Sequence, residues 1–207
     1  MGNEFAFSDA PASWIILIST CCISLYTLYM NNSMLARMMF HPYSFFHDNR
    51  IFTVITSGFV HADMMHLLFN MLTFYFFAFQ LETNEIIGTG GFLLIYLGSM
   101  IFSDLPTAIK HRNDREYRSL GASGAISGIV FSNILFAPSA KMYVMLLPIP
   151  IPASIFGILY LAYCYYASKH SNDMINHEAH FWGALTGVII TAIIYPGVLS
   201  DFLRNVI

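Results

Sequence analysis

The stretch GASGAISGIVFSNILFAP, residues 121–138, is apolar enough for a membrane segment yet carries glycine and serine at helical intervals. Gly121, Gly124 and Gly128 fall at i, i+3 and i+7, on one face of a helix, where small residues let two helix backbones approach closely in a membrane. Packing alone would explain the glycines. Ser123 adds a hydroxyl at the expected helix N-terminus, where free N–H groups and the helix dipole favour a developing anion, so we interpret it as a candidate nucleophile.

Composition places the chain in a membrane. Of its 207 residues, 57% are hydrophobic and 10% are charged, whereas a soluble domain carries about 25% charged residues. The formal net charge of −3 gives no support to nucleic-acid binding. The three cysteines all fall in apolar runs and are interpreted as buried small hydrophobes, not as a disulfide framework or a metal-ligand set.

A membrane crossing by a helix needs roughly 20 apolar residues. The chain offers six such segments, and the first is interpreted as a permanent span because it lacks the basic start of a signal peptide. We therefore expect an all-α membrane protein, a single domain over residues 1–207, with spans at about 13–30, 60–80, 88–104, 121–138, 143–167 and 179–199.

The links between the expected spans differ in character. The first, residues 31–59, mixes aromatic and polar residues, which predicts short helices lying partly in the membrane interface. Pro148, Pro150 and Pro152 predict a kink or a late helix start in the fifth span. The odd-numbered links hold seven of the nine basic residues, so the positive-inside rule would place them in the cytoplasm: Arg37, Arg50, Lys110, Arg112, Arg115, Arg118 and Lys169.

The last expected span repeats the glycine spacing around a histidine. His180, Gly183 and Gly187 fall at i, i+3 and i+7, so the face that carries the imidazole can also pack tightly. If this face meets the glycine face of residues 121–138, Ser123 and His180 come within reach, and a serine with a histidine base is the minimum machinery for acyl transfer. The alternative for His180 is a structural hydrogen bond to a backbone carbonyl. Glu178 is expected to face elsewhere.

The second expected span supplies candidate hydrogen-bond donors. His66 and Asn70 lie at i, i+4 on one face, and both can donate to an oxyanion. The alternative for Asn70 is a structural hydrogen bond to a neighbouring helix. His61 is expected to point away from His66 and to stabilise the turn before the helix.

The sequence supports metal binding and transport less well than acyl transfer. The run His177-Glu178-Ala179-His180 is one residue short of the zincin pattern, and no carboxylate or cysteine set completes the histidine pair, so we expect neither metal nor cofactor. A small transporter would show internal symmetry, and the sequence shows none.

Taken together, these motifs resemble those of the rhomboid intramembrane serine proteases. The shared elements are two histidines and an asparagine in the second span (His61, His66 and Asn70), Gly-x-Ser-Gly at residues 121–124, and Ala-His-x-x-Gly-x-x-x-Gly at residues 179–187. Arg50 occupies the place of the arginine in the first-loop Trp-Arg pair of the family.

The resemblance implies a six-transmembrane-helix bundle with a membrane-embedded first loop. It implies that Ser123 is the nucleophile and His180 the general base, as a dyad without a carboxylate, and that His66, Asn70 and the backbone N–H of Ser123 form the oxyanion hole. The resemblance also implies that the substrates are single-span membrane proteins, which are cut in or near their transmembrane segment. The protein would then be an integral, multi-pass membrane protein, and we expect it in a cell membrane.

This sequence departs from the family pattern at three points. Asn49 replaces the tryptophan of the Trp-Arg pair, and Ser127 stands where many bacterial members carry a tyrosine that stacks on the catalytic histidine. The family's usual bacterial orientation also puts the odd links outside the cytoplasm, against the charge count. The second functional hypothesis is a non-catalytic rhomboid-like protein that binds membrane clients, although such proteins typically lack the serine or the histidine.

Overall fold

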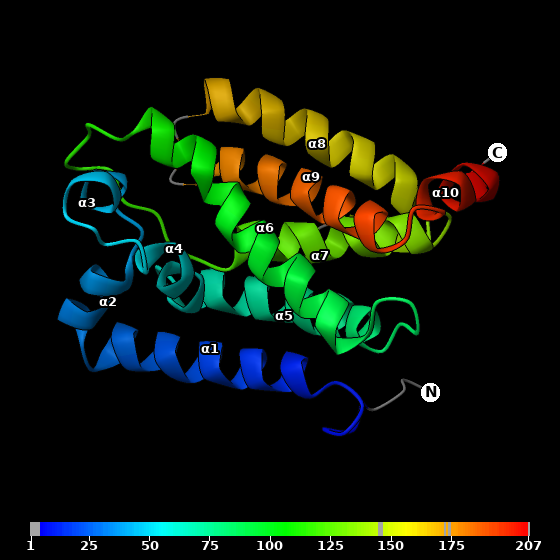
Figure 1. Ribbon diagram of the computed structural model, residues 1–207, viewed down its shortest axis with the longest axis horizontal. Helices are drawn as coiled ribbons and strands as arrows, with labels where there is room; N and C mark the ends of the chain where they lie inside the picture. The colour runs from blue at the N-terminus through cyan, green and yellow to red at the C-terminus, as the bar shows by residue number, and fades with distance from the viewer. Residues whose placement is uncertain (1–4, 145–146, 172, 174, 207) are drawn as a thin grey trace.

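The computed structural model describes residues 5–144, 147–171, 173 and 175–206. Among these residues, six helices of 14 residues or more each overlap one of the expected segments and together form a bundle (Figure 1). They are α1 (Pro11–Tyr29), α5 (Met64–Glu82), α6 (Gly88–Lys110), α7 (Ser123–Phe136), α8 (Ala153–His170) and α9 (His177–Ile194).

Three of these helices, α1, α5 and α6, are long and apolar enough by themselves to cross a membrane. A fourth candidate is the pair α9 and α10 (Val198–Val206), which meet at an angle of 111°. The chain is therefore an all-α, integral membrane protein, and six crossings remain a prediction.

Two of the expected spans have the wrong boundaries. The segment 179–199 is not one helix, because Pro196 and Gly197 interrupt it between α9 and α10. The segment 143–167 begins instead in a two-stranded antiparallel hairpin, β1 (Lys141–Val144) and β2 (Leu147–Pro152), and α8 starts only at Ala153. The late helix start expected from the prolines is thus confirmed. Proline lacks an N–H donor and is tolerated in a strand that lies at an edge.

The first link folds as predicted into short helices. They are α2 (Asn32–Met38), α3 (Pro42–His47), α4 (Thr53–Thr56) and the 3₁₀ turn η1 (Ser57–Phe59). Phe40 pairs with Ser119 as an isolated antiparallel bridge, so the first link is tied to the loop that precedes α7.

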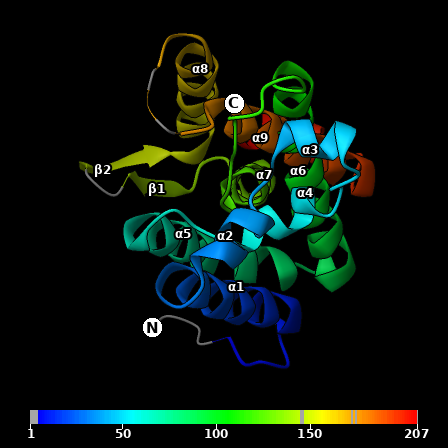
Figure 2. The same cartoon turned by 90° about the vertical axis from the view of Figure 1, so that its left-hand side faces the viewer.

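Helix α7 occupies the middle of the bundle, with α5, α6, α8 and α9 around it (Figure 2). Every residue from Gly124 to Ser132 is buried. At 1.5 Å per residue its 14 residues span only about 21 Å, less than the roughly 30 Å hydrocarbon core. Helix α7 is therefore shorter than the other helices of the bundle, and Ser123 is its N-terminal residue.

The glycine faces of α7 and α9 meet backbone to backbone, as the sequence predicts. A Cβ atom added to Gly183 would lie 2.1 Å from the carbonyl oxygen of Gly124, and one added to Gly187 would lie 2.2 Å from that of Gly128. No side chain fits at these distances, so α9 packs this closely on α7 because residues 183 and 187 are glycine. A Cβ atom on Gly124 or Gly128 would instead collide with Ser103 or Ser99 of α6.

We expect Gly183→Ala to lower the free energy of unfolding by about 1–3 kcal/mol, because the new methyl group overlaps the backbone of α7 and must push the helices apart. Thermal unfolding in detergent measures this. Gly90→Ala is the matched control, since nothing lies within 4 Å of the methyl group it adds to α6. Equal stability of the two variants would contradict the close packing.

Candidate active site

The backbone before Ser123 is bent in a way that favours glycine. Gly121 has φ of +111°, a conformation that side chains disfavour, and its N–H donates to the carbonyl of Ser57 at 2.9 Å. The turn ends the loop and starts α7 at Ser123, as predicted. The hydroxyl therefore lies at the N-terminal end of a buried helix, close to free N–H groups.

The imidazole of His180 lies against this hydroxyl. Its Nε2 is 2.7 Å from Oγ of Ser123, a hydrogen bond between groups 57 residues apart in the sequence. His180 lies in the first turn of α9, whose N-cap Asn176 accepts a hydrogen bond from the N–H of Ala179 at 3.0 Å. The Gly124–Gly183 contact one helical turn away sets the separation of the two helices, and so the reach of the pair.

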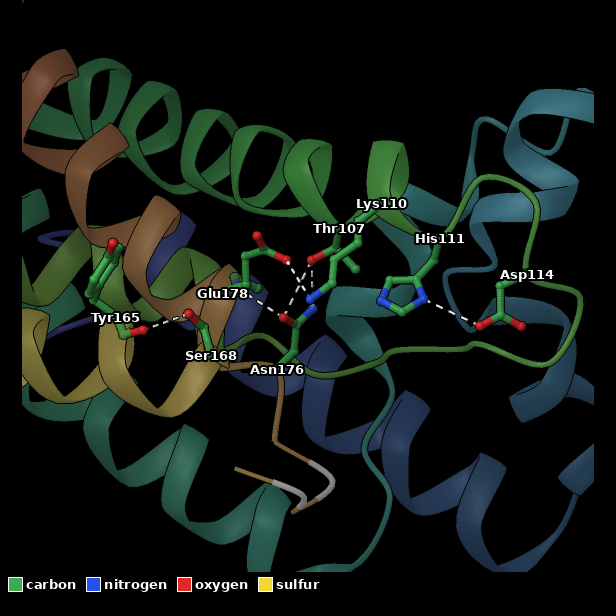
Figure 3. Close-up of polar contacts among 9 residues, drawn as sticks. Thr107, Lys110, His111, Asp114, Tyr165, Ser168, Asn176 and Glu178 are labelled. Atoms are coloured by element: carbon green, nitrogen blue, oxygen red, sulfur yellow. Dashed lines mark hydrogen bonds and ion pairs between the residues drawn. The ribbon is translucent and has the colours of Figure 1, made fainter. Parts of the chain in front are cut away.

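Glu178 faces away from the imidazole, as expected. Its carboxylate pairs with Lys110 of α6 at 3.8 Å, beside the contact of Asn176 with Thr107 (Figure 3). Among the described residues, the only hydrogen bond of the His180 ring is the one to Ser123. Within the described part of the chain, the Ser123–His180 pair, which we call the dyad, thus has no carboxylate bonded to its imidazole.

Asp173 is a second acidic residue near this end of α9, in the loop after α8. Its carboxylate accepts a hydrogen bond from Nε2 of His177 at 3.1 Å, and this bond lowers the pKa of Asp173 to about 2. The carboxylate is thus ionised at neutral pH and holds His177, not His180.

Tyr160 of α8 holds the imidazole in place, a role that the sequence analysis missed. Its ring stacks on His180 with centroids 6.4 Å apart and planes within 11°, in the range of offset aromatic pairs. Its hydroxyl is 3.0 Å from Oγ of Ser127. Ser127, which replaces the family's stacking tyrosine, therefore anchors a tyrosine that arrives from another helix. No sequence spacing relates residues of α7 to residues of α8, so the contact between Ser127 and Tyr160 could not be predicted from the sequence.

Two candidate oxyanion donors flank the same turn. A Cβ atom on Gly121 would lie 2.7 Å from Nε2 of His66 and 3.6 Å from Nδ2 of Asn70, so both groups of α5 adjoin the backbone leading to Ser123. Nδ2 of Asn70 is buried and has no hydrogen-bond partner among the described residues. A buried donor left unpaired costs about 1–3 kcal/mol, which makes this amide ready to bind an incoming acceptor.

The expectation that His61 points away from His66 is wrong. The two rings lie 4.9 Å apart, edge to face. Asp63 caps α5, so His61 precedes the helix and helical spacing does not apply to it. Its Nδ1 lies 2.9 Å from Oγ of Ser24 in α1, which supports the predicted role in fixing the turn before α5.

Arg50 lies outside the site. Its guanidinium donates to the carbonyl of Arg37 and lies over the ring of Phe52, with 5.6 Å between the guanidinium carbon and the ring centroid. It joins the short helices of the first link to one another, which is a structural role.

A cavity of about 630 Å³ opens beside the dyad, between α5 and α8. Ser123, Asn70 and His180 line one part of it, and the rest is mostly apolar. Phenylalanines from three helices and residues of β1 complete the wall: Phe69, Phe76, Phe77, Phe131, Phe156, Met142 and Tyr143. Ser123, Asn70 and His180 are thus among a few polar groups in the wall of a mostly apolar space, the usual form of a binding site.

Comparison with known proteins agrees with the motifs and the fold. The Rhomboid domain family matches residues 48–197, more than half of the chain. The chain is 30% identical to "RHOMBOID-like protein 12, mitochondrial" of Arabidopsis thaliana over 167 residues, which is 73% of this chain and 49% of that protein.

Two further relatives come from a bacterium and from yeast. The chain is 32% identical to YdcA of Bacillus subtilis (strain 168), named as a candidate rhomboid protease, over 67% of this chain and 64% of that protein. It is 28% identical to "Rhomboid protein 1, mitochondrial" of Saccharomyces cerevisiae over 66% of this chain and 40% of that protein. The chain spans less than two thirds of the length of each relative. It is an integral membrane protein with a paired serine and histidine in its core, and it belongs to the rhomboid family.

We expect Tyr160→Ala to lower the rate at which a fluorophosphonate labels Ser123 by about 10–100-fold, because a misplaced imidazole activates the hydroxyl poorly. Tyr160→Phe keeps the stacked ring and should restore most of that rate. Tyr166→Ala, on an exposed ring of the same helix that stacks on His170, is the control. Equal labelling of all three variants would show that the stack does not position His180.

Proposed function

We propose that the protein is an intramembrane serine endopeptidase. The observation that carries the proposal is the 2.7 Å hydrogen bond between Ser123 Oγ and His180 Nε2, with the unpaired amide of Asn70 beside it. A nucleophile, a base and an oxyanion donor are the parts that acyl transfer requires.

The first chemical step follows from these positions. Nε2 of His180 accepts the proton of the Ser123 hydroxyl as Oγ attacks a peptide carbonyl, so the other ring nitrogen, Nδ1, must carry the proton of the neutral imidazole. The carbonyl oxygen becomes an oxyanion that His66, Asn70 and the N–H of Ser123 stabilise. His180 then protonates the leaving amine, and the acyl group stays on Ser123.

Water completes the cycle. His180, neutral again, accepts a proton from a water molecule whose oxygen attacks the acyl carbonyl. The bond from the acyl carbon to Oγ then breaks, His180 returns the proton to Oγ of Ser123, and the peptide leaves with a new carboxyl terminus. The dyad lies at the N-terminal start of α7, and the cavity that Ser123 and His180 line gives this water a path to it.

The substrate class is proposed from the cavity. Its walls are apolar and it lies between α5 and α8, so a segment of a single-span membrane protein could enter from the lipid and unwind at the polar end. An unwound peptide exposes the carbonyl that Ser123 attacks, whereas a helix hides it in hydrogen bonds.

The competing proposal is a non-catalytic protein that binds membrane clients in the same cavity. It requires no hydrogen bond between a serine and a histidine and no free donor at Asn70. The complete constellation therefore favours catalysis, and chemical labelling separates the two proposals.

Ser123→Ala and His180→Ala should each abolish cleavage of a single-span reporter in liposomes, and Asn70→Ala should lower its rate by on the order of a hundredfold or more. The Ser123 and His180 variants remove the nucleophile and the base, while the Asn70 variant removes one donor to the oxyanion.

Ser19→Ala serves as the control, because that hydroxyl only donates to the carbonyl of Ile16 within α1. Undiminished cleavage by purified Ser123→Ala protein would reject the proposed function. A wild-type protein that neither cleaves nor reacts with a fluorophosphonate would favour client binding.

A further inference from the structure

A cysteine and two histidines, one of them His180 of the dyad, lie close together where α8 packs on α9. Cys164 comes from α8, and His177 and His180 lie one turn apart on α9. One ligand atom from each residue lies within 4.8 Å of the others. The sequence offered only the histidine pair, and the packing of α8 on α9 supplies the thiol that the pair lacked.

The hydrogen bonds decide which atoms are available. Nε2 of His177 is bonded to Asp173, and Nε2 of His180 is bonded to Ser123, so Nδ1 remains on each ring. Nδ1 of His177 is buried and unpartnered within the described part of the chain, on a side chain that is only 4% exposed. A buried polar atom without a partner is costly, and a metal ion would satisfy it.

We propose that Cys164 Sγ, His177 Nδ1 and His180 Nδ1 bind a Zn²⁺ ion that switches the enzyme off. One sulfur and two nitrogens are a ligand set that zinc prefers, and three protein ligands with one water is a common arrangement. The cavity that His180 lines would supply that water and the path by which the ion arrives. Cys164 gives up its thiol proton on binding, since the thiolate is the ligand.

Asp173 supports this assignment independently. A histidine that ligates zinc usually donates its other N–H to a carboxylate, which fixes the tautomer of the ring. Asp173 accepts from Nε2 of His177 at 3.1 Å and so leaves Nδ1 without a proton, as a ligand must be. Ligand atoms around tetrahedral zinc lie about 3.5 Å apart, so small side-chain rotations would complete the site.

The consequence for catalysis follows from the tautomer of His180, and it rests on the proposed function. General-base chemistry needs the proton on Nδ1 and a free lone pair on Nε2. A metal ion on Nδ1 forces the proton of the neutral imidazole onto Nε2, which faces Ser123. The ring then donates to the serine and cannot accept its proton, so the ion inhibits by holding the base in the wrong form.

The first experiment measures the metal directly, without activity. Co²⁺, a spectroscopic substitute for zinc, is titrated into Ser123→Ala protein in detergent. We expect one equivalent to bind, with a thiolate-to-cobalt charge-transfer band and the visible bands of tetrahedral cobalt. Adding Cys164→Ala should remove the charge-transfer band, whereas adding Cys22→Ala, on an exposed cysteine of α1, should leave it intact. Absence of a thiolate band in the Ser123→Ala protein overturns the metal site.

The second experiment measures inhibition. Zn²⁺ should block fluorophosphonate labelling of the wild-type protein, a chelator should restore it, and Cys164→Ala or His177→Gln should raise the inhibitory concentration by about 10–100-fold. Cys22→Ala and His170→Ala are the controls, and equal sensitivity of all variants overturns inhibition through this site. A protein that binds Co²⁺ through Cys164 but never labels would instead reject the proposed protease and leave the metal site standing.

Discussion

The contact on which the rest of the structure depends is the backbone approach of α7 to α9. Gly124 against Gly183, and Gly128 against Gly187, allow carbonyl oxygens to lie where any side chain would collide. In a membrane no hydrophobic force pulls apolar helices together, so close van der Waals packing of small residues has to hold them. That packing also fixes the distance between the serine and the histidine that start the two helices.

The other parts of the site are arranged around this contact. The dyad lies at its N-terminal end, α5 brings amide and imidazole donors to the turn at Gly121, and α8 brings the ring of Tyr160, which stacks on the imidazole. Each of these groups of side chains lies on a separate helix, so a rigid element positions each of them. The cavity between α5 and α8 is lined by Ser123 and by His180, the residue that the serine and the cluster around Cys164 share.

The sequence patterns predicted the structure correctly where the residues concerned lie within one helix or at a proline. The spacings of Gly183 and Gly187, the start of α7 at Ser123, and the late start of α8 all depend on local periodicity or on proline, and the structure agrees with them. The patterns failed at element ends. His61 lies before α5, so helical spacing gave it the wrong direction, and the hairpin at Lys141 was hidden in an apolar run that equally suits a helix.

By itself the sequence determined the residue types, the apolar segments, and the faces on which glycine, serine and histidine fall. Only the tertiary structure decided that Tyr160 replaces a stacking partner absent at Ser127, and that Cys164 lies beside two histidines of α9. The physical reason is that periodicity relates residues on one helix, whereas contacts between helices depend on rotation and depth. Those are set by packing, and here a few glycines decide them.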